Sequence, residues 1–248
     1  MSQSCGTPRI AGGEAPDWQN QILLWRFSLI LDPMPREKYE RLLTPEEEAQ
    51  VKTLRRPEDQ TRAVATRASL RLILATALRC DPRDIHYQRT ERGKPYLDPR
   101  RHREDLQFNL SHSGDWGLVA LTQERPLGVD LEVRRPLMDA LALARRFFSP
   151  REYQTLAQAA PAERERRFLE YWTAKEAYLK ATGEGLSAGL ASVEVDLQQG
   201  SFVGLPLETP WQLVRGYLEL DAPWALAYAG AERPFTLLPF SLPDNPLA

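Results

Sequence analysis

The residues that could do chemistry lie in two short stretches, of which the first is LGVDLEV at 127–133. Asp130 and Glu132 are two positions apart on a predicted strand, so both carboxylates point to one face. Neighbouring carboxylates repel each other unless a cation lies between them, and Mg²⁺ in proteins takes carboxylates together with phosphate oxygens and water. The alternative for an isolated pair is an amphipathic strand with a wet acidic face.

The second stretch is ERERRFLEYWTAKEAYLKATGEGLS at 163–187. Its apolar and aromatic side chains recur at helical spacing, which predicts a helix that packs one face on a core and ends at a glycine-containing turn. Glu176 and Lys180 are four positions apart and share a face, and Lys175 lies beside them. Such charges are costly on a partly buried helix unless they are paired or used, although Glu–Lys pairs are also common on ordinary solvated helices.

Two further segments offer groups that could hold a ligand. Residues 108–114, FNLSHSG, are predicted to place hydroxyls, an amide and an imidazole in a turn between strands, where they could bind a phosphate or the edge of a base. His112 could equally be an ordinary loop histidine, and neither His86 nor His102 has metal-type spacing to it. Gly93-Lys94-Pro95 predicts a tight turn that presents a cation.

Composition limits the classes of protein to be considered. The chain has 248 residues, 42% hydrophobic and 27% charged, which is typical of a globular protein of one large or two small domains. The net charge of −2 gives no reason to expect nucleic acid or membrane partners, and no apolar run reaches the about 18 residues of a membrane span. Two cysteines and no signal-like N-terminus predict no disulfide and a cytoplasmic location. Motifs of dinucleotide enzymes, P-loop kinases, α/β-hydrolases and zincins are absent.

The predicted elements favour an α+β fold, because the strands come in runs. Strands are expected at 22–31, 85–89, 106–110, 116–122, 127–133, 191–197, 211–219 and 224–229. Helices are expected at 36–55 in two pieces, 57–79, 137–147, 149–159 and 163–182. Each half has the order strand, helices, strands. The predicted organisation is a flexible leader at 1–20, an N-terminal half at 21–124, a C-terminal half with the acidic residues at 125–240, and a tail at 241–248, with the last ten residues irregular.

Together these segments resemble the 4′-phosphopantetheinyl transferases, and most of all the long single-chain type that activates surfactin synthetase. The pair G-x-D-x-E and W-x-x-K-E-x-x-x-K, about 40 residues apart, is the specific part of the resemblance. The matching segments are G-K-P at 93–95, F-N-L-S-H-S at 108–113, G-V-D-L-E at 128–132, R-F-F-S at 146–149 and W-T-A-K-E-A-Y-L-K at 172–180.

The resemblance implies a fold and a reaction. The fold would have two similar halves related by a pseudo-twofold axis, each a small, mostly antiparallel sheet packed on a long helix. Coenzyme A would bind in the cleft between the halves. The reaction would move 4′-phosphopantetheine from coenzyme A to a serine of an acyl or peptidyl carrier protein and release 3′,5′-ADP. The chain would act as a monomer and require Mg²⁺, for which Mn²⁺ suits the same ligands.

The resemblance also implies roles for residues at the matching positions. Asp130, Glu132 and Glu176 would be the metal carboxylates, and Glu176 would also be the general base toward the carrier serine. Lys180 would neutralise charge on the pyrophosphate, with help from Lys175. Candidates for holding the adenine and the 3′-phosphate are Arg62, Arg89, Gly93, Lys94, Pro95, Ser111 and His112, with Arg67 as a rival of Arg62.

Two questions stay open at this point. Carrier docking is expected at Arg145, Arg146, Phe147 and Phe148, although both phenylalanines could instead belong to the core. The alternatives to a transferase are a catalytically degenerate protein that binds coenzyme A or a carrier protein, and a Mg²⁺-dependent hydrolase that uses the same acids on water.

Overall fold

The computed structural model describes residues 17–31, 35–134, 139–185, 189–205, 208–219 and 221–246. The strands are β1 (Ile22–Ser28), β2 (Tyr87–Arg89), β3 (Pro95–Leu97), β4 (Leu106–Ser113), β5 (Trp116–Gln123), β6 (Leu127–Leu131), β7 (Glu194–Asp196), β8 (Ser201–Val203), β9 (Trp211–Leu218), β10 (Ala222–Ala229) and β11 (Phe235–Phe240). The helices are α1 (Arg36–Glu40), α2 (Pro45–Lys52), α3 (Pro57–Leu78), α4 (Ala140–Phe147), α5 (Pro150–Gln158) and α6 (Pro161–Thr182), with short 3₁₀ turns η1 (Pro82–Asp84) and η3 (Leu190–Ser192).

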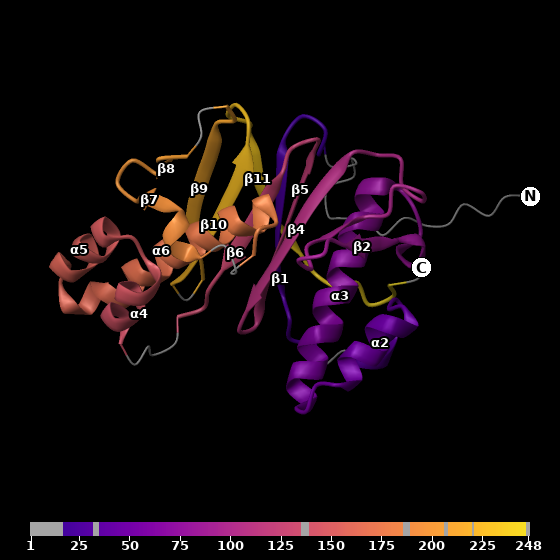
Figure 1. The fold of residues 1–248 in the computed structure, drawn as a ribbon. Coiled ribbons are helices and arrows are strands. Elements are labelled where there is room, and N and C mark those ends of the chain that lie inside the picture. The colour runs from indigo at the N-terminus through magenta and orange to yellow at the C-terminus, as the bar shows by residue number, and fades with distance from the viewer. Residues whose placement is uncertain are drawn as a thin grey trace, which may run out of the picture.

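Four layers build the molecule: a helix, two sheets and a second helix (Figure 1). The first sheet has the strand order β11-β1-β5-β4 and the second has the order β6-β10-β9. All neighbours in them are antiparallel except β1 and β11, which run parallel. The fold is therefore α+β with mainly antiparallel sheets, as the order of elements predicts.

Strand alternation explains the layers, since successive side chains point to opposite faces of a sheet. On β1, Leu23, Trp25 and Phe27 pack in the core beneath α3, whereas Ile22 and Leu24 pack in the core between the two sheets. A third core lies between the second sheet and α6. Each sheet is thus apolar on both faces, which is why the strand segments are almost continuously hydrophobic.

The same order of elements occurs twice along the chain. A strand is followed by three helices, a 3₁₀ turn, two short paired strands and a hairpin of eight-residue strands. The third helix, α3 or α6, has 22 residues in both cases and begins with a proline. The second helix, α2 or α5, begins at a capping box formed by Thr44 with Glu47 or by Ser149 with Glu152.

Side chains of β4 connect the two sheets, because β4 lies beside β6 without belonging to the same sheet. Asn109 Oδ1 accepts a hydrogen bond from Val129 N at 2.9 Å, and Ser113 Oγ accepts one from Val133 N at 3.0 Å. These residues and Ser111 alternate along β4 and so project from one face of the strand. The junction between the sheets is therefore polar at this edge.

Several predictions need correction. Strand β4 continues to Ser113, so Ser111 and His112 lie in a strand and not in a turn. Short strands β3 and β8 were not predicted, and β11 includes Pro239 and Phe240, which were expected in an irregular tail. Pro239 is tolerated because β11 is an edge strand. The partner strand β1 lies some two hundred residues earlier in the chain.

The predicted domain boundaries stay predictions, although two contacts bear on them. Trp18, in the predicted leader, is buried and donates from Nε1 to Ala77 O at 3.2 Å. Strand β11, in the predicted C-terminal half, completes the first sheet. Residues 1–16, 137–138 and 247–248 of the predicted leader, helix and tail lie outside the described residues. No helix of the described part is both long and apolar enough to cross a membrane.

Candidate active site

Asp130 is the centre of the acidic site, and β6 holds it almost fully buried. Its Oδ1 accepts hydrogen bonds from Ser111 Oγ at 2.9 Å and from Lys180 Nζ at 2.6 Å, while Lys180 also donates to Ser111 Oγ at 3.0 Å. Its Oδ2 is buried and has no hydrogen-bond partner within the described ranges. Burial raises the pKa of Asp130 and the Lys180 ammonium opposes that rise. One carboxylate oxygen is thus fixed and the other is left for a ligand.

Glu132 lies one residue past the end of β6 and is held in the same way. Its Oε2 accepts a hydrogen bond from Ser113 Oγ at 2.8 Å. Two serines at alternate positions of β4 therefore hold two carboxylates, one in β6 and one just beyond its end. This confirms the expectation that Asp130 and Glu132 point to one side, and it identifies Ser113 as a residue that the sequence analysis missed.

Glu176 projects from α6 toward the same two acids. Its pKa is raised to about 7, mainly by burial and then by the negative charge of Asp130, with Lys180 opposing and Glu132 adding to the rise. Its Oε1 is buried without a partner in the described part of the chain. A carboxyl group with this pKa exchanges its proton near neutral pH, which suits a general base.

Gly128 explains how α6 comes so close to β6. A Cβ atom at Gly128 would lie 2.1 Å from Ala177 O and 2.4 Å from Ala181 N, so only glycine allows the helix backbone to rest on the strand. This close approach places Lys180 within hydrogen-bond distance of Asp130, two residues along β6. The glycine of the G-x-D-x-E motif therefore positions the two acidic residues relative to α6.

A divalent cation suits the chemistry of these carboxylates, although the side chains do not converge on a preformed site. Among the described residues, no three His, Cys, Asp or Glu side chains come together in an arrangement that could hold a metal ion. The donors nevertheless include two buried carboxylate oxygens without partners, Asp130 Oδ2 and Glu176 Oε1. An all-oxygen donor set of this kind fits a hard cation such as Mg²⁺ or Mn²⁺.

A group of basic side chains lies on the first-half side of the acids. Burial lowers the pKa of Arg67, with Glu47 opposing and Arg89 adding to the effect. Burial also lowers the pKa of His112, and the cations Lys180 and Arg67 lower it further. Arg67, Arg89 and His112, called the basic group below, thus form a row of neighbouring basic side chains next to Lys180 of α6, and an anionic ligand relieves repulsion of this kind.

Arg67 fits this group better than Arg62, which the sequence favoured for the 3′-phosphate. The Arg62 guanidinium is paired with Asp115 at 2.8 Å and lies 3.6 Å from Asp59. The hydrogen bonds of Arg67 go to neutral acceptors, Ala63 O at 3.1 Å and Gln50 Oε1 at 3.3 Å. Arg67 therefore keeps a guanidinium whose charge is less compensated.

The Gly93-Lys94-Pro95 segment forms the predicted tight turn between β2 and β3, with Gly93 in the left-handed region at φ +87°. The Lys94 ammonium does not point into open solvent. It donates to Ala181 O at 2.6 Å and to Leu127 O at 3.3 Å, and burial lowers its pKa to about 8. Lys94 thus contacts the second half directly.

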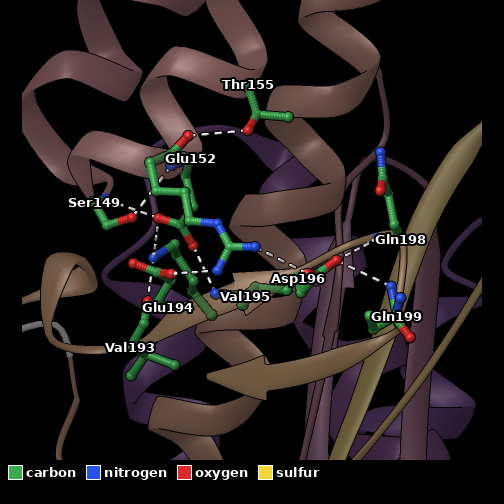
Figure 2. Close-up of polar contacts among 11 residues, drawn as sticks. Ser149, Glu152, Thr155, Val193, Glu194, Val195, Asp196, Gln198 and Gln199 are labelled. Carbon is green, nitrogen blue, oxygen red and sulfur yellow. Dashed lines mark hydrogen bonds and ion pairs between the residues drawn. The ribbon is translucent and has the colours of Figure 1, made fainter. Parts of the chain in front are cut away.

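Lys175 is not brought to the acidic site. It is fully buried, lies 2.7 Å from Glu152 Oε2, and donates to Leu190 O at 2.9 Å and to Val193 O. Figure 2 shows the surroundings of Glu152, with Ser149 and Val195 directed at its carboxylate and Val193 nearby. The expected help of Lys175 with the pyrophosphate has no support in these contacts, which tie α6 to α5 and to η3.

The segment expected to dock a carrier protein contains two packed phenylalanines and two exposed arginines. Phe148 is buried and stacks on Phe168 at 4.9 Å between ring centroids, and Phe147 packs edge-on against Trp172 at 6.0 Å. Arg145 and Arg146 are exposed. The alternative that both phenylalanines belong to the core between the second sheet and α6 therefore holds.

A cavity of about 640 Å³ lies apart from the acidic site, between α5, α6 and β9. Its arginines are mostly paired: Arg151 with Glu194 and Asp196 at 3.3 Å each, Arg166 with Glu170 at 3.3 Å, and Arg167 with Glu163 at 3.0 Å. Compensated charges of this kind do not call for an ionic ligand, so we place the active site at Asp130, Glu132, Glu176 and Lys180.

Comparison with known proteins identifies the family of this chain. A family model described as 4′-phosphopantetheinyl transferase superfamily matches residues 126–229, and one described as 4′-phosphopantetheinyl transferase, N-terminal, matches residues 34–124. A putative 4′-phosphopantetheinyl transferase of Synechocystis is 41% identical over 68% of this chain and 68% of its own. The transferase HetI of Nostoc is 36% identical over 85% of this chain and 89% of its own, and Sfp of Bacillus subtilis is 31% identical over 73% and 80%. The chain belongs to the 4′-phosphopantetheinyl transferase superfamily and is an enzyme of its long single-chain type.

Proposed function

We propose that this enzyme transfers 4′-phosphopantetheine from coenzyme A to a serine of an acyl or peptidyl carrier protein and releases 3′,5′-ADP. The observation that carries the proposal is that a set of carboxylates and a set of basic side chains lie next to each other. Within the described ranges, Asp130 and Glu176 each present a buried carboxylate oxygen without a partner, Glu132 lies beside them, and the basic group faces these acids from the other half. A pyrophosphate and a 3′-phosphate need such cations, and a hydroxyl nucleophile needs such a base.

Glu176 is the proposed general base. The carrier serine oxygen attacks the β-phosphate of coenzyme A, a new P–O bond forms, and the bond to the departing 3′,5′-ADP breaks with its electron pair. The serine proton passes to Glu176, whose pKa of about 7 keeps part of it ionised at neutral pH. A positioned base of this kind typically contributes ~10²–10⁴-fold.

Lys180 is the proposed electrostatic partner of the pyrophosphate of coenzyme A, on which negative charge develops as 3′,5′-ADP departs. Its ammonium already donates to Asp130 and Ser111, so it is held in place before a substrate arrives. A preorganised cation stabilises developing negative charge without reorganising at the moment of reaction. Asp130 and Ser111 therefore serve to aim Lys180 as well as to complete the acidic site.

Mg²⁺ would be held by Asp130, Glu132 and Glu176, with Mn²⁺ suiting the same oxygens. When bound, it supplies Lewis-acid charge neutralisation at the phosphates. The nucleotide end of coenzyme A is assigned to the basic group, with Arg67 and Arg89 at the 3′-phosphate and the Gly93–Pro95 turn near the adenine. Ser111 and His112 lie on β4, where Ser111 contacts Asp130 and Lys180.

The repeated order of elements supports a pseudo-twofold relation between the halves, with coenzyme A bound where they meet. On this proposal one chain provides both walls of the cleft, so the enzyme works as a monomer. Carrier docking is assigned to the exposed Arg145 and Arg146, since carriers of this class are expected to be acidic around the modified serine. A cytoplasmic location stays a prediction.

The test is the intact mass of an apo carrier protein incubated with this enzyme, coenzyme A and Mg²⁺. We expect the carrier to gain one phosphopantetheine group and the gain to vanish in EDTA. Hydrolysis of coenzyme A without a carrier would favour the hydrolase. Binding of coenzyme A without modification of acyl or peptidyl carriers would favour the degenerate binding protein.

A further inference from the structure

The tip of the β2–β3 hairpin, residues 90–94, crosses from the first half to the C-terminal end of α6. Lys94 Nζ donates to Ala181 O at 2.6 Å and to Leu127 O at 3.3 Å. Arg92 Nη1 donates to Glu184 O at 3.4 Å, just beyond the helix. The tip itself is rigid, since Gly93 N and Lys94 N both bond to Thr90, through its carbonyl and its side chain. This hydrogen-bonded turn thus holds the Lys94 ammonium against the second half.

The contact satisfies a specific need of α6. The last four carbonyls of a helix have no partner within the helix, and the C-terminal end carries partial negative charge. Gly183, the residue after α6, donates from its backbone N to Leu179 O and so satisfies one of these four carbonyls. Ala181 O receives its partner from Lys94, which lies 87 residues earlier. The opposite half therefore satisfies one carbonyl of the last turn of α6, in addition to the C-cap that Gly183 provides.

The capped turn is next to the catalytic side chains. Ala181 directly follows Lys180, whose ammonium bonds to Asp130 and Ser111. The second acceptor of Lys94, Leu127 O, directly precedes Gly128, where β6 and α6 are in closest contact. Lys94 is thus wedged between the start of β6 and the end of α6. A shift of either element would change the distance from Lys180 to Asp130.

We propose that Lys94 is a positioning residue, which fixes the C-terminal turn of α6 to the hairpin and so sets Lys180 and Glu176 relative to the nucleotide-binding side. The inference rests on the proposed function only for its expected effect on the rate of transfer. The expected effect on the end of α6 does not depend on that function. It differs from the role that the family resemblance implies, in which Lys94 would hold the adenine or 3′-phosphate of coenzyme A.

The first measurement needs no substrate. Hydrogen–deuterium exchange of backbone amides is compared at pH 7, without coenzyme A, in the wild type, Lys94→Met, Lys94→Arg and the control Lys52→Met, which removes an exposed lysine of the same half. We expect amides at the end of α6, residues 179–185, to exchange about tenfold faster in Lys94→Met, which corresponds to about 1.4 kcal/mol. Lys94→Arg should recover most of the protection, and Lys52→Met should behave as wild type.

The second measurement is steady-state transfer with the same variants. A positioning role predicts that Lys94→Met lowers kcat about tenfold or more and changes the KM for coenzyme A less than threefold, with partial recovery in Lys94→Arg. A ligand role predicts the reverse, a raised KM with kcat kept. Unchanged exchange at residues 179–185, or an effect confined to KM, would overturn the proposal. Absence of transfer in the wild type would refute the proposed function instead, while the exchange experiment would still decide the role of Lys94.

Discussion

The two halves contain the same buried ion pair at the same place, and they differ in the residue that comes next. In the first half Arg71 Nε lies 2.9 Å from Glu47, and in the second half Lys175 Nζ lies 2.7 Å from Glu152. Each cation stands fourteen residues after the proline that begins its long helix. Each acid comes from the capping box of the preceding helix.

The correspondence extends to main-chain contacts. Arg71 also donates to Pro82 O and Ile85 O around η1, and Lys175 donates to the carbonyls around η3, three residues apart in both cases. Both pairs therefore tie the second helix, the long helix and the following 3₁₀ turn together. A contact that occurs in both halves belongs to the scaffold.

The two halves differ at the residue that directly follows each buried cation. Leu72 follows Arg71 and is fully buried in the first core, whereas Glu176 follows Lys175 and keeps a buried oxygen without a partner in the described structure. Four residues later, Thr76 bonds to its own helix at Leu72 O, whereas Lys180 bonds across to Asp130. The two segments thus share an order of elements and a buried ion pair, and they differ in the polar contacts of the residues that follow.

The largest expected effect comes from the two residues that differ. Glu176→Gln should lower kcat by ~10²–10⁴, because it removes the base, while the unfolding temperature is kept. Leu72→Ala, at the matching position, should lower the free energy of unfolding by about 2–5 kcal/mol and leave kcat of the folded enzyme near wild type. Steady-state kinetics and thermal unfolding of both variants check this. Full turnover by Glu176→Gln would remove Glu176 from the mechanism.

The matching ion pairs should respond alike. Lys175→Met and Arg71→Met should each lower the free energy of unfolding by about 3–5 kcal/mol, since each leaves a buried carboxylate without its cation. Adding Glu152→Gln to Lys175→Met, or Glu47→Gln to Arg71→Met, should recover part of the loss. Denaturant titrations measure all four variants. If only Lys175→Met lost activity in its folded fraction, Lys175 would contribute to the site and not to the scaffold alone.

A smaller effect is expected where the first half contributes to binding. Arg67→Ala should weaken coenzyme A binding about 10–100-fold, because charged hydrogen bonds contribute about 1.5–3 kcal/mol each. Arg62→Ala is the matched control, since Arg62 is already paired with Asp115, and it should change the dissociation constant less than threefold. Calorimetric titration distinguishes the two arginines. A larger loss in Arg62→Ala would restore the role that the sequence favoured for it.

The smallest expected effect is on how the free energy of unfolding depends on pH. Burial lowers the pKa of Lys175 from 10.5, despite the opposing charge of Glu152, whereas an arginine stays protonated throughout this range. The folded protein therefore binds this proton less tightly than the unfolded chain, so this group makes the free energy of unfolding increase as the pH rises toward 10.5. Lys175→Arg should lack that increase, and its stability relative to wild type should fall between pH 7 and pH 10. Equal slopes in denaturant titrations would contradict the lowered pKa.

The sequence predicts much of this comparison but not all of it. Periodicity and capping signals identify both long helices and both Ser/Thr-Pro starts, because these features are local. Spacing pairs Asp130 with Glu132 and Glu176 with Lys180, whereas the common site of these four residues is predicted only from the resemblance to the family. Strand β11 and the burial of Trp18 depend on contacts between distant parts of the chain, which no local pattern records.

The same limit explains why contacts of individual residues differ from what the sequence suggests. Lys175 directly precedes Glu176 in the motif, and only the packing of α5 shows that Lys175 faces Glu152. Arg62 and Arg67 share the charge and helix that the motif requires, and only Asp115, from the β4–β5 turn, separates them. The polar alternation of Asn109, Ser111 and Ser113 was a usable signal for residues that contact β6.

The most direct test of the division between the halves is the binding of coenzyme A to Glu176→Gln in the presence of EDTA. With the metal removed, affinity depends on the basic group of the first half and on Lys180, none of which this substitution changes. We predict a dissociation constant within about threefold of wild type, less than 0.7 kcal/mol, alongside lost transfer. Loss of binding together with turnover would contradict the account, because Glu176 would then hold the substrate and not only act on it.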